Sequence, residues 1–173
     1  EIGNMCSAVP GVDARLVWKG VHLDRRLTPI NGQVGGAAGV TEYLWHGLGF
    51  GGSCFPKDVA ALRSFGRTVG EQTRMLDAVL DINTDQPLRM VALLEKELSL
   101  AGKTVAVLGL AFKPGTDDLR ESPALPLVAE LRKKGAKVLV HDPIAMPHAK
   151  KRPEFRDVVF AEDWAEALRK SDA

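Results

Sequence analysis

Hydrophobic residues recur at helical spacing over the first 100 residues of the chain, whereas later they form short continuous runs. Apolar side chains three or four positions apart predict amphipathic helices. Two short helical patterns separated by Pro10 and Gly11 occupy residues 1–23. A further helix should begin at Pro56, a residue suited to the first helical turn. Residues 72–100 predict one long helix that bends at Pro87, because proline interrupts helical hydrogen bonding.

From Lys103 the pattern changes to strands that alternate with helices. KTVAVLGLAF, AKVLVHDP and DVVF read as buried strands, and SPALPLVAELRKKG reads as the helix between the first two. Such alternation predicts parallel βαβ units. We therefore expect an α/β protein. Residues 1–100 would form a helical central region, and residues 101–173 a Rossmann-like doubly wound parallel sheet that is incomplete at its C-terminus.

Composition narrows the classes of function. The chain has 173 residues, is 45% hydrophobic and carries a net charge of only +1 from mixed charges of both signs. This balance argues against nucleic acid as a primary partner. Because no apolar run reaches about 20 residues and no signal-peptide pattern is present, we expect no membrane partner and a cytoplasmic location. The N-terminal residues read as the middle of a helix, so we expect a piece of a longer protein.

One of the two cysteines lies in a motif that suggests chemistry, GFGGSCFPKD at residues 49–58. Glycines before Cys54 allow close approach of a ligand, and Lys57 supplies a cation that favours a thiolate. Asp58, one helical turn after the cysteine, can manage protons or water. The motif therefore predicts a nucleophilic thiol, with an incidental cysteine in a glycine-rich turn as the alternative.

A second motif, GLAFKPGTDDLRES at residues 109–122, follows the first predicted strand. Ligands of open α/β sheets bind beyond the carboxyl ends of the strands. Lys113 and Arg120 could bind a phosphate beside a helix N-terminus there, or they could simply pair with neighbouring carboxylates. Asp142, which ends the second strand, could accept ribose hydroxyls or could serve the turn before Pro143.

The two motifs, about 50 residues apart and separated by the long helix, together closely resemble those of the UDP-glucose and GDP-mannose dehydrogenase family. Members of that family oxidise the C6 alcohol of a nucleotide sugar to the acid with two NAD in succession. The resemblance implies the end of the family's central domain, followed by most of its nucleotide-sugar domain. It also implies a homodimer formed through the central helix.

The resemblance also assigns roles to individual residues. Cys54 matches the nucleophile that forms a thiohemiacetal and then a thioester, and Asp58 matches the aspartate that handles protons and water. Positions that contact NAD match Lys57 and Arg120. Positions that contact the sugar nucleotide match Arg26, which would reach the neighbouring subunit's substrate, and Phe50, Gly51, Phe112 and Lys113. No metal is implied.

The chain also departs from the family pattern. The N-terminal Rossmann domain and the family's catalytic lysine and asparagine are missing, so we expect this piece alone to be inactive. Between Arg26 and Tyr43 the chain is about a dozen residues longer than in common members, which affects the match of Arg26. The sequence CFPKD favours UDP-glucose as substrate, with GDP-mannose or another nucleotide sugar as the alternative. A nucleotide-binding dimerisation module without chemistry and a thiol hydrolase also stay open.

Overall fold

The computed structural model describes residues 2–23 and 45–173, which belong to two compact units, residues 1–47 and 48–173. The first unit contains α1 (Ile2–Ala8) and α2 (Ala14–His22), so the two predicted short helices are confirmed. Asp13 caps α2, because its side chain accepts a hydrogen bond from the backbone N–H of Arg15 at 2.8 Å. Cys6, on α1, is buried.

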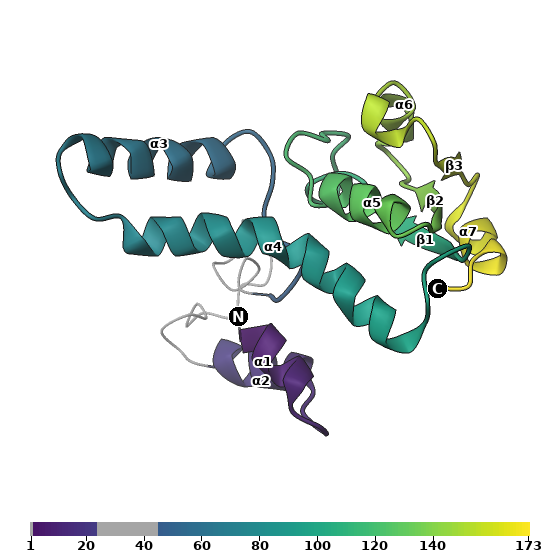
Figure 1. Ribbon diagram of the computed structural model, residues 1–173, viewed down its shortest axis with the longest axis horizontal. Coiled ribbons are helices and arrows are strands. Elements are labelled where there is room, and N and C mark those ends of the chain that lie inside the picture. The colour runs from purple at the N-terminus through teal and green to yellow at the C-terminus, as the bar shows by residue number, and fades with distance from the viewer. Residues whose placement is uncertain (1, 24–44) are drawn as a thin grey trace. The chain divides into compact units, whose positions relative to one another are not determined.

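The second unit begins with a helical hairpin, α3 (Phe55–Thr68) and α4 (Arg74–Glu97), which lie side by side in Figure 1. Pro56 stands in the first turn of α3, as expected. The long predicted helix is confirmed as α4, and its ribbon changes direction about midway along its length (Figure 1). Pro87 lies inside this helix, where proline removes one helical hydrogen bond. Asp77 of α4 pairs with Arg63 and Arg67 of α3, which ties the hairpin together.

The C-terminal part of this unit is a parallel sheet in the order β1-β2-β3, formed by β1 (Thr104–Leu108), β2 (Lys137–His141) and β3 (Val159–Phe160). The connections contain α5 (Ala124–Lys133), α6 (Met146–Ala149) and the short 3-10 helix η2 (Pro153–Phe155). The last helix, α7 (Trp164–Lys170), follows β3. The predicted α/β class with a parallel sheet is therefore confirmed.

Both faces of the sheet are covered, as in a doubly wound fold. Val138 and Val140 of β2 point to the face that packs with α5, whereas Leu139 between them is buried on the opposite face. The helix α7 also packs on β1 and β2, and its Ala167 is fully buried. This coverage explains why the strands read as continuous apolar runs rather than as alternating ones.

After α7 the chain returns to the edge of β1 that faces away from β2. The backbone N–H of Asp172 donates to the carbonyl of Thr104 at 2.7 Å, and the N–H of Ala106 donates to the carbonyl of Ala173 at 2.7 Å. Thus the connections run outward from β1 to β3 and then cross back past β1. This reversal marks the topological switch point of a doubly wound sheet, where ligands bind beyond the strand ends.

The main hydrophobic core lies between the sheet, α5 and the second half of α4. Its largest fully buried side chains come from α4, β2, α5, η2 and the segment after β1, namely Val91, Leu110, Val128, Leu131, Val138, Val140 and Phe155. The C-terminal half of the long helix therefore packs in the core of the sheet region, whereas its N-terminal half packs against α3.

Buried Asp142 connects the ends of β1 and β2. One carboxylate oxygen accepts the backbone N–H groups of Leu110 and Ala111, at 2.7 and 3.2 Å, and the other accepts those of Ile144 and Ala145, at 2.8 and 2.7 Å. Burial acts most strongly on the pKa of Asp142 and raises it, but the four N–H donors together hold that pKa below its ordinary value. Of the two roles considered, the structure supports the structural one.

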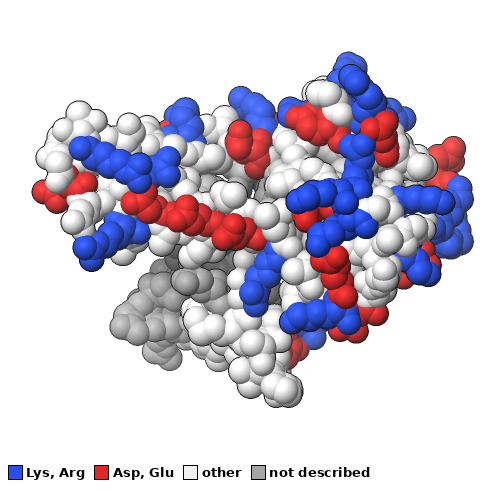
Figure 2. All heavy atoms as spheres, in the orientation of Figure 1, with Lys and Arg blue, Asp and Glu red and all other residues white. Residues whose placement is uncertain are grey.

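Charged side chains of both signs are interspersed over the face shown in Figure 2, which agrees with the small net charge. Within the described ranges, no helix combines the length and the apolar character needed to cross a membrane.

We predict that Asp142→Asn destabilises the chain by about 2 kcal/mol at pH 7, because the new amide leaves two buried N–H donors facing an N–H₂ group. Since the folded pKa is depressed, the carboxylate's contribution is complete above its unfolded pKa of about 3.9 and is lost as pH falls through the folded value. Denaturant unfolding measured from pH 7 down to about pH 2 tests this, because the loss occurs below the unfolded pKa. The exposed Asp85→Asn is the control, and equal midpoints for both variants would contradict the assignment.

Candidate functional site

Cys54 occupies the N-cap position of α3, directly before the first helical residue, and its thiol is free and exposed. The backbone N–H of Asp58 donates to the carbonyl of Cys54 at 2.8 Å, so these two residues stand one helical turn apart, as the motif predicted. The hydroxyl of Ser53 lies 3.7 Å from the Cys54 Sγ. An exposed thiol at a helix N-terminus is well placed to act as a nucleophile.

The glycine loop before Cys54 packs directly against the motif after β1. The N–H of Gly52 donates to the carbonyl of Arg120 at 2.8 Å. A Cβ atom on Gly51 would lie 2.2 Å from the carbonyl oxygen of Glu121, and one on Gly52, whose φ is +83°, would lie 2.8 Å from the ring of Phe112. The two motifs that are distant in sequence therefore meet through backbone contacts that only glycine permits.

The two cations assigned to cofactor binding are each held by a neighbouring carboxylate. Arg120 donates hydrogen bonds from Nε and from one terminal nitrogen to the two carboxylate oxygens of Asp118, at 3.0 and 2.8 Å. These hydrogen bonds lower the pKa of Asp118 to about 2. Lys57 pairs with Asp58, whose hydrogen bond raises the pKa of Lys57. The negative charge of a Cys54 thiolate acts in the same direction, though less strongly, on the pKa of both cations. Both therefore lie within electrostatic reach of the thiol.

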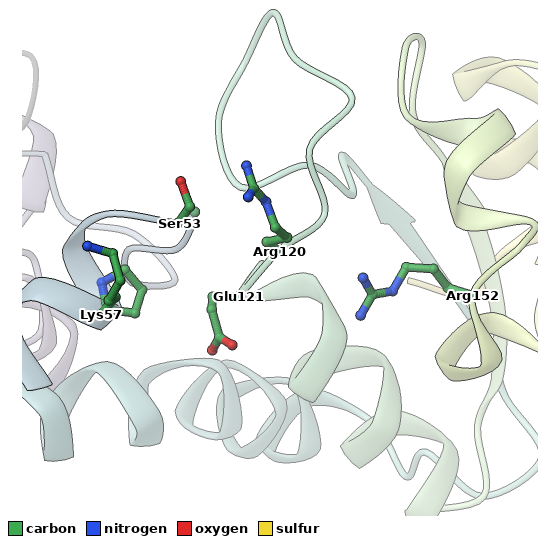
Figure 3. A pocket seen from close by; sticks show the side chains of 7 residues that line it. Ser53, Lys57, Arg120, Glu121 and Arg152 are labelled. Carbon is green, nitrogen blue, oxygen red and sulfur yellow. The ribbon is translucent and has the colours of Figure 1, made fainter.

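A cavity of about 510 Å³ opens beside this arrangement (Figure 3). Three cations line it: Lys57 from α3, Arg120 from the motif after β1, and Arg152 from the segment before η2. Glu121 is the one carboxylate among its lining residues, which also include Gly52, Ser53 and Pro56. Three cations and a hydroxyl against one carboxylate suit an anionic ligand such as a diphosphate.

The residues assigned to the sugar nucleotide occupy different positions around the two motifs. Half-buried Phe50 makes an edge-to-face contact with Phe55, at 6.2 Å between ring centroids. Phe112 packs near the glycine loop, and the ammonium of exposed Lys113 stands 5.4 Å from its ring centroid. Arg26 lies outside the described residues, as does the glycine-rich stretch at 28–40.

Two residues that the sequence analysis overlooked take part in the site. Arg152 lines the cavity and is oriented by Glu154, to which it bonds through Nε at 3.2 Å. The sequence does contain an indication of its role, because Arg152 lies in the connection after β2, and ligands bind beyond the carboxyl ends of such strands. Asn83 of α4 binds the backbone of Phe50 through both its amide atoms. The sequence indication for Asn83 is that asparagine, a poor helix former, stands in the middle of a long helix.

Neither a histidine partner for Cys54 nor a metal site is found among the described residues. His46, the histidine nearest to Cys54 in sequence, packs against Gly3 of α1 in the first unit. Across residues 2–23 and 45–173, no group of three or more His, Cys, Asp or Glu side chains is arranged to hold a metal ion.

Comparison with known proteins matches the whole chain to one family of dehydrogenases. Residues 1–85 match the central domain of the UDP-glucose/GDP-mannose dehydrogenase family, and residues 106–173 match the UDP binding domain of that family. The UDP-glucose 6-dehydrogenase AglM of Haloferax volcanii is 44% identical over all 173 residues. The chain spans only 37% of the length of that relative.

Solved structures resemble the fold as well. A UDP-glucose dehydrogenase from Pyrobaculum islandicum, 41% identical, superimposes with a TM-score of 0.80 over 93% of this chain and 34% of its own. A GDP-mannose dehydrogenase from Pseudomonas aeruginosa, 30% identical, gives a TM-score of 0.64 over 99% of this chain and 38% of its own. Together with the two domain matches, these similarities show that the chain belongs to the UDP-glucose/GDP-mannose dehydrogenase family.

Proposed function

We propose that this chain is part of an NAD-dependent dehydrogenase that oxidises UDP-glucose to UDP-glucuronate through a covalent bond to Cys54. The observation that carries the proposal is an exposed thiol at the start of α3, next to a cavity lined by three cations. Covalent oxidation of a nucleotide sugar requires a nucleophile beside a site for the diphosphate of a dinucleotide cofactor. The relatives reported at 44% and 41% identity are both named for UDP-glucose, which supports this substrate over GDP-mannose, the substrate named for the 30% identical structure.

The residues around the cavity fit a dinucleotide cofactor. Lys57 and Arg120, with Arg152 opposite them, supply cations for its phosphates, and Ser53 supplies a hydroxyl. NAD, when bound, accepts one hydride in each of two oxidation steps. The bidentate contact with Asp118 leaves Arg120 a terminal nitrogen that can bind a phosphate oxygen.

The protein's own groups then account for the intermediates. The Cys54 thiolate attacks the C6 aldehyde carbon formed by the first oxidation, and the carbonyl oxygen takes up a proton to give a thiohemiacetal. Loss of a hydride and a proton converts this adduct to a thioester. Water attacks the thioester carbon, the C–S bond breaks, and the thiolate and the uronate are released. Asp58, one turn from Cys54, would position this water and accept its proton.

The sugar nucleotide would lie on the other side of the cysteine loop. Phe50 and Phe112 offer rings for the sugar or base, Lys113 offers a cation for the diphosphate, and Gly51 offers backbone without an obstructing side chain. The match of residues 106–173 to a UDP binding domain supports this assignment.

The whole enzyme would be a cytoplasmic homodimer. Residues 1–100 would belong to its central domain and residues 101–173 to its nucleotide-sugar domain, as the matched ranges support. Apolar side chains left exposed on α3 and α4 support an interface there, namely Leu62, Phe65, Met75, Val79, Leu88 and Met90. In such a dimer Arg26 would reach the substrate of the partner subunit.

We predict that the complete enzyme forms two NADH for each UDP-glucose consumed, and that Cys54→Ser forms no detectable uronate. The serine hydroxyl is too weak a nucleophile at neutral pH to replace the thiolate. Absorbance at 340 nm and chromatography of the product measure both quantities, with Cys6→Ala as the matched cysteine control. One NADH per sugar would refute the thioester route, whereas turnover of GDP-mannose alone would change the substrate and keep the chemistry.

We further predict that Arg120→Ala raises the KM for NAD about tenfold and changes the KM for UDP-glucose little. The variant removes a charged hydrogen bond to a phosphate, a loss of roughly 1.4 kcal/mol or more. Initial-rate kinetics with each substrate varied in turn measure the effect. Exposed Arg156→Ala, outside the cavity, should behave as wild type. Equal increases in both KM values would argue against a cofactor role.

For the isolated chain, we predict that UDP raises the melting temperature without NAD, while no NADH is formed from UDP-glucose. Residues 106–173 match the UDP binding domain, and a ligand that binds only the folded state stabilises it. Differential scanning fluorimetry measures the shift, which Cys54→Ser should leave intact. Reduction of NAD by the isolated chain would contradict the expectation that this part is inactive alone.

A further inference from the structure

The side chain of Asn83 makes two hydrogen bonds with the backbone of one residue in the cysteine loop. The N–H of Phe50 donates to Asn83 Oδ1 at 2.7 Å, and Asn83 Nδ2 donates to the carbonyl of Phe50 at 3.0 Å. The primary amide of asparagine carries an acceptor oxygen and a donor N–H₂, so it can bind both the N–H and the carbonyl of the same residue. Asn83 thereby connects α4 to a point four residues before Cys54.

The loop is shaped around this contact. Gly49 has a φ of +113°, and a Cβ atom there would lie 2.5 Å from Asn83 Oδ1. On the far side of Phe50, the N–H of Gly52 is bound by the carbonyl of Arg120. The loop is therefore held at Phe50 by α4 and at Gly52 by the motif after β1. Both attachments lie within four residues of the thiol.

The choice of residue at position 83 does not serve the helix itself. Asparagine is a poor helix former, because its side chain competes for backbone hydrogen bonds. In the neighbouring residue, the Thr84 hydroxyl donates a hydrogen bond to the Leu80 carbonyl of the same helix, at 2.9 Å. In contrast, both the oxygen and the nitrogen of the Asn83 amide form hydrogen bonds with a residue 33 positions earlier in the chain.

We propose that Asn83 is a positioning residue for the reactive thiol: it holds the Phe50 backbone so that Cys54 stays beside Lys57 and Arg120. Without it, the loop would lose its hydrogen bonds to α4 while the bond at Gly52 remained, and the start of α3 could shift relative to the motif after β1. The catalytic part of this inference rests on the proposed function, whereas the effect on thiol reactivity does not.

The experiment compares Asn83→Ala and Asn83→Asp with wild type in the complete protein. Asn83→Asp keeps the acceptor for the Phe50 N–H but places a carboxylate oxygen against the Phe50 carbonyl. We expect both variants to lower kcat by about tenfold or more, since small misplacement of a reacting group is costly. We also expect iodoacetamide to modify Cys54 several-fold more slowly, as followed by mass spectrometry of the cysteine peptide.

Two control variants on α4 distinguish positioning from general support of the fold. Thr84→Ala removes a hydroxyl that donates to the Leu80 carbonyl of its own helix, directly beside Asn83. Val91→Ala truncates a side chain in the core, away from the loop. Both should leave kcat and the alkylation rate within about twofold of wild type, as for distant sites that do not couple.

The inference is overturned if Asn83→Ala alkylates and turns over like wild type, or if Val91→Ala slows both as much. Should no nucleotide sugar be oxidised, the alkylation rates still decide the role of Asn83. In that case slower alkylation supports the positioning of the thiol while the proposed dehydrogenase function fails.

Discussion

The backbone contact between the glycine loop and the motif after β1 is the constraint on which the candidate site depends. The N–H of Gly52 meets the carbonyl of Arg120 at 2.8 Å, and the adjoining atoms are too close for any side chain at Gly51. This contact brings the thiol at the start of α3 to the ligand-binding edge of the sheet. Space requires a glycine at position 51, and position 52 adds a φ of +83° that favours glycine.

Around this contact, charge serves orientation more than stability. The ion pair Lys57–Asp58 is exposed, and the pair Arg120–Asp118 joins an exposed arginine to a half-buried carboxylate; pairs with an exposed partner contribute little to folding. Their effect is to hold two cations at the cavity, with Lys57 on one side, Arg152 on the other, and Arg120 and Glu121 between them (Figure 3). The buried carboxylate of Asp142 has the opposite character, because four backbone donors use both its oxygens and it keeps the ends of β1 and β2 in register.

Much of the fold could be predicted from local pattern. The long helix, the helix beginning at Pro56 and the alternating strands all appear in the structure close to their predicted limits. These features depend on hydrophobic period and on proline, which act through neighbours in the chain. Asp142 was open between two roles, because a carboxylate after a strand can face either a ligand or the backbone, and sequence does not show which donors surround it.

By itself, the sequence determined the secondary structure, the two motifs and the residue types that could carry the chemistry, since each is a property of adjacent residues. Tertiary structure decided which of them meet. Arg152 and Asn83 are separated from Cys54 by 98 and 29 positions, and nothing in their own segments connects them to it. Arg152 reaches the cavity because parallel strands place their following loops at one edge of the sheet, and Asn83 reaches the loop because α4 runs beside it.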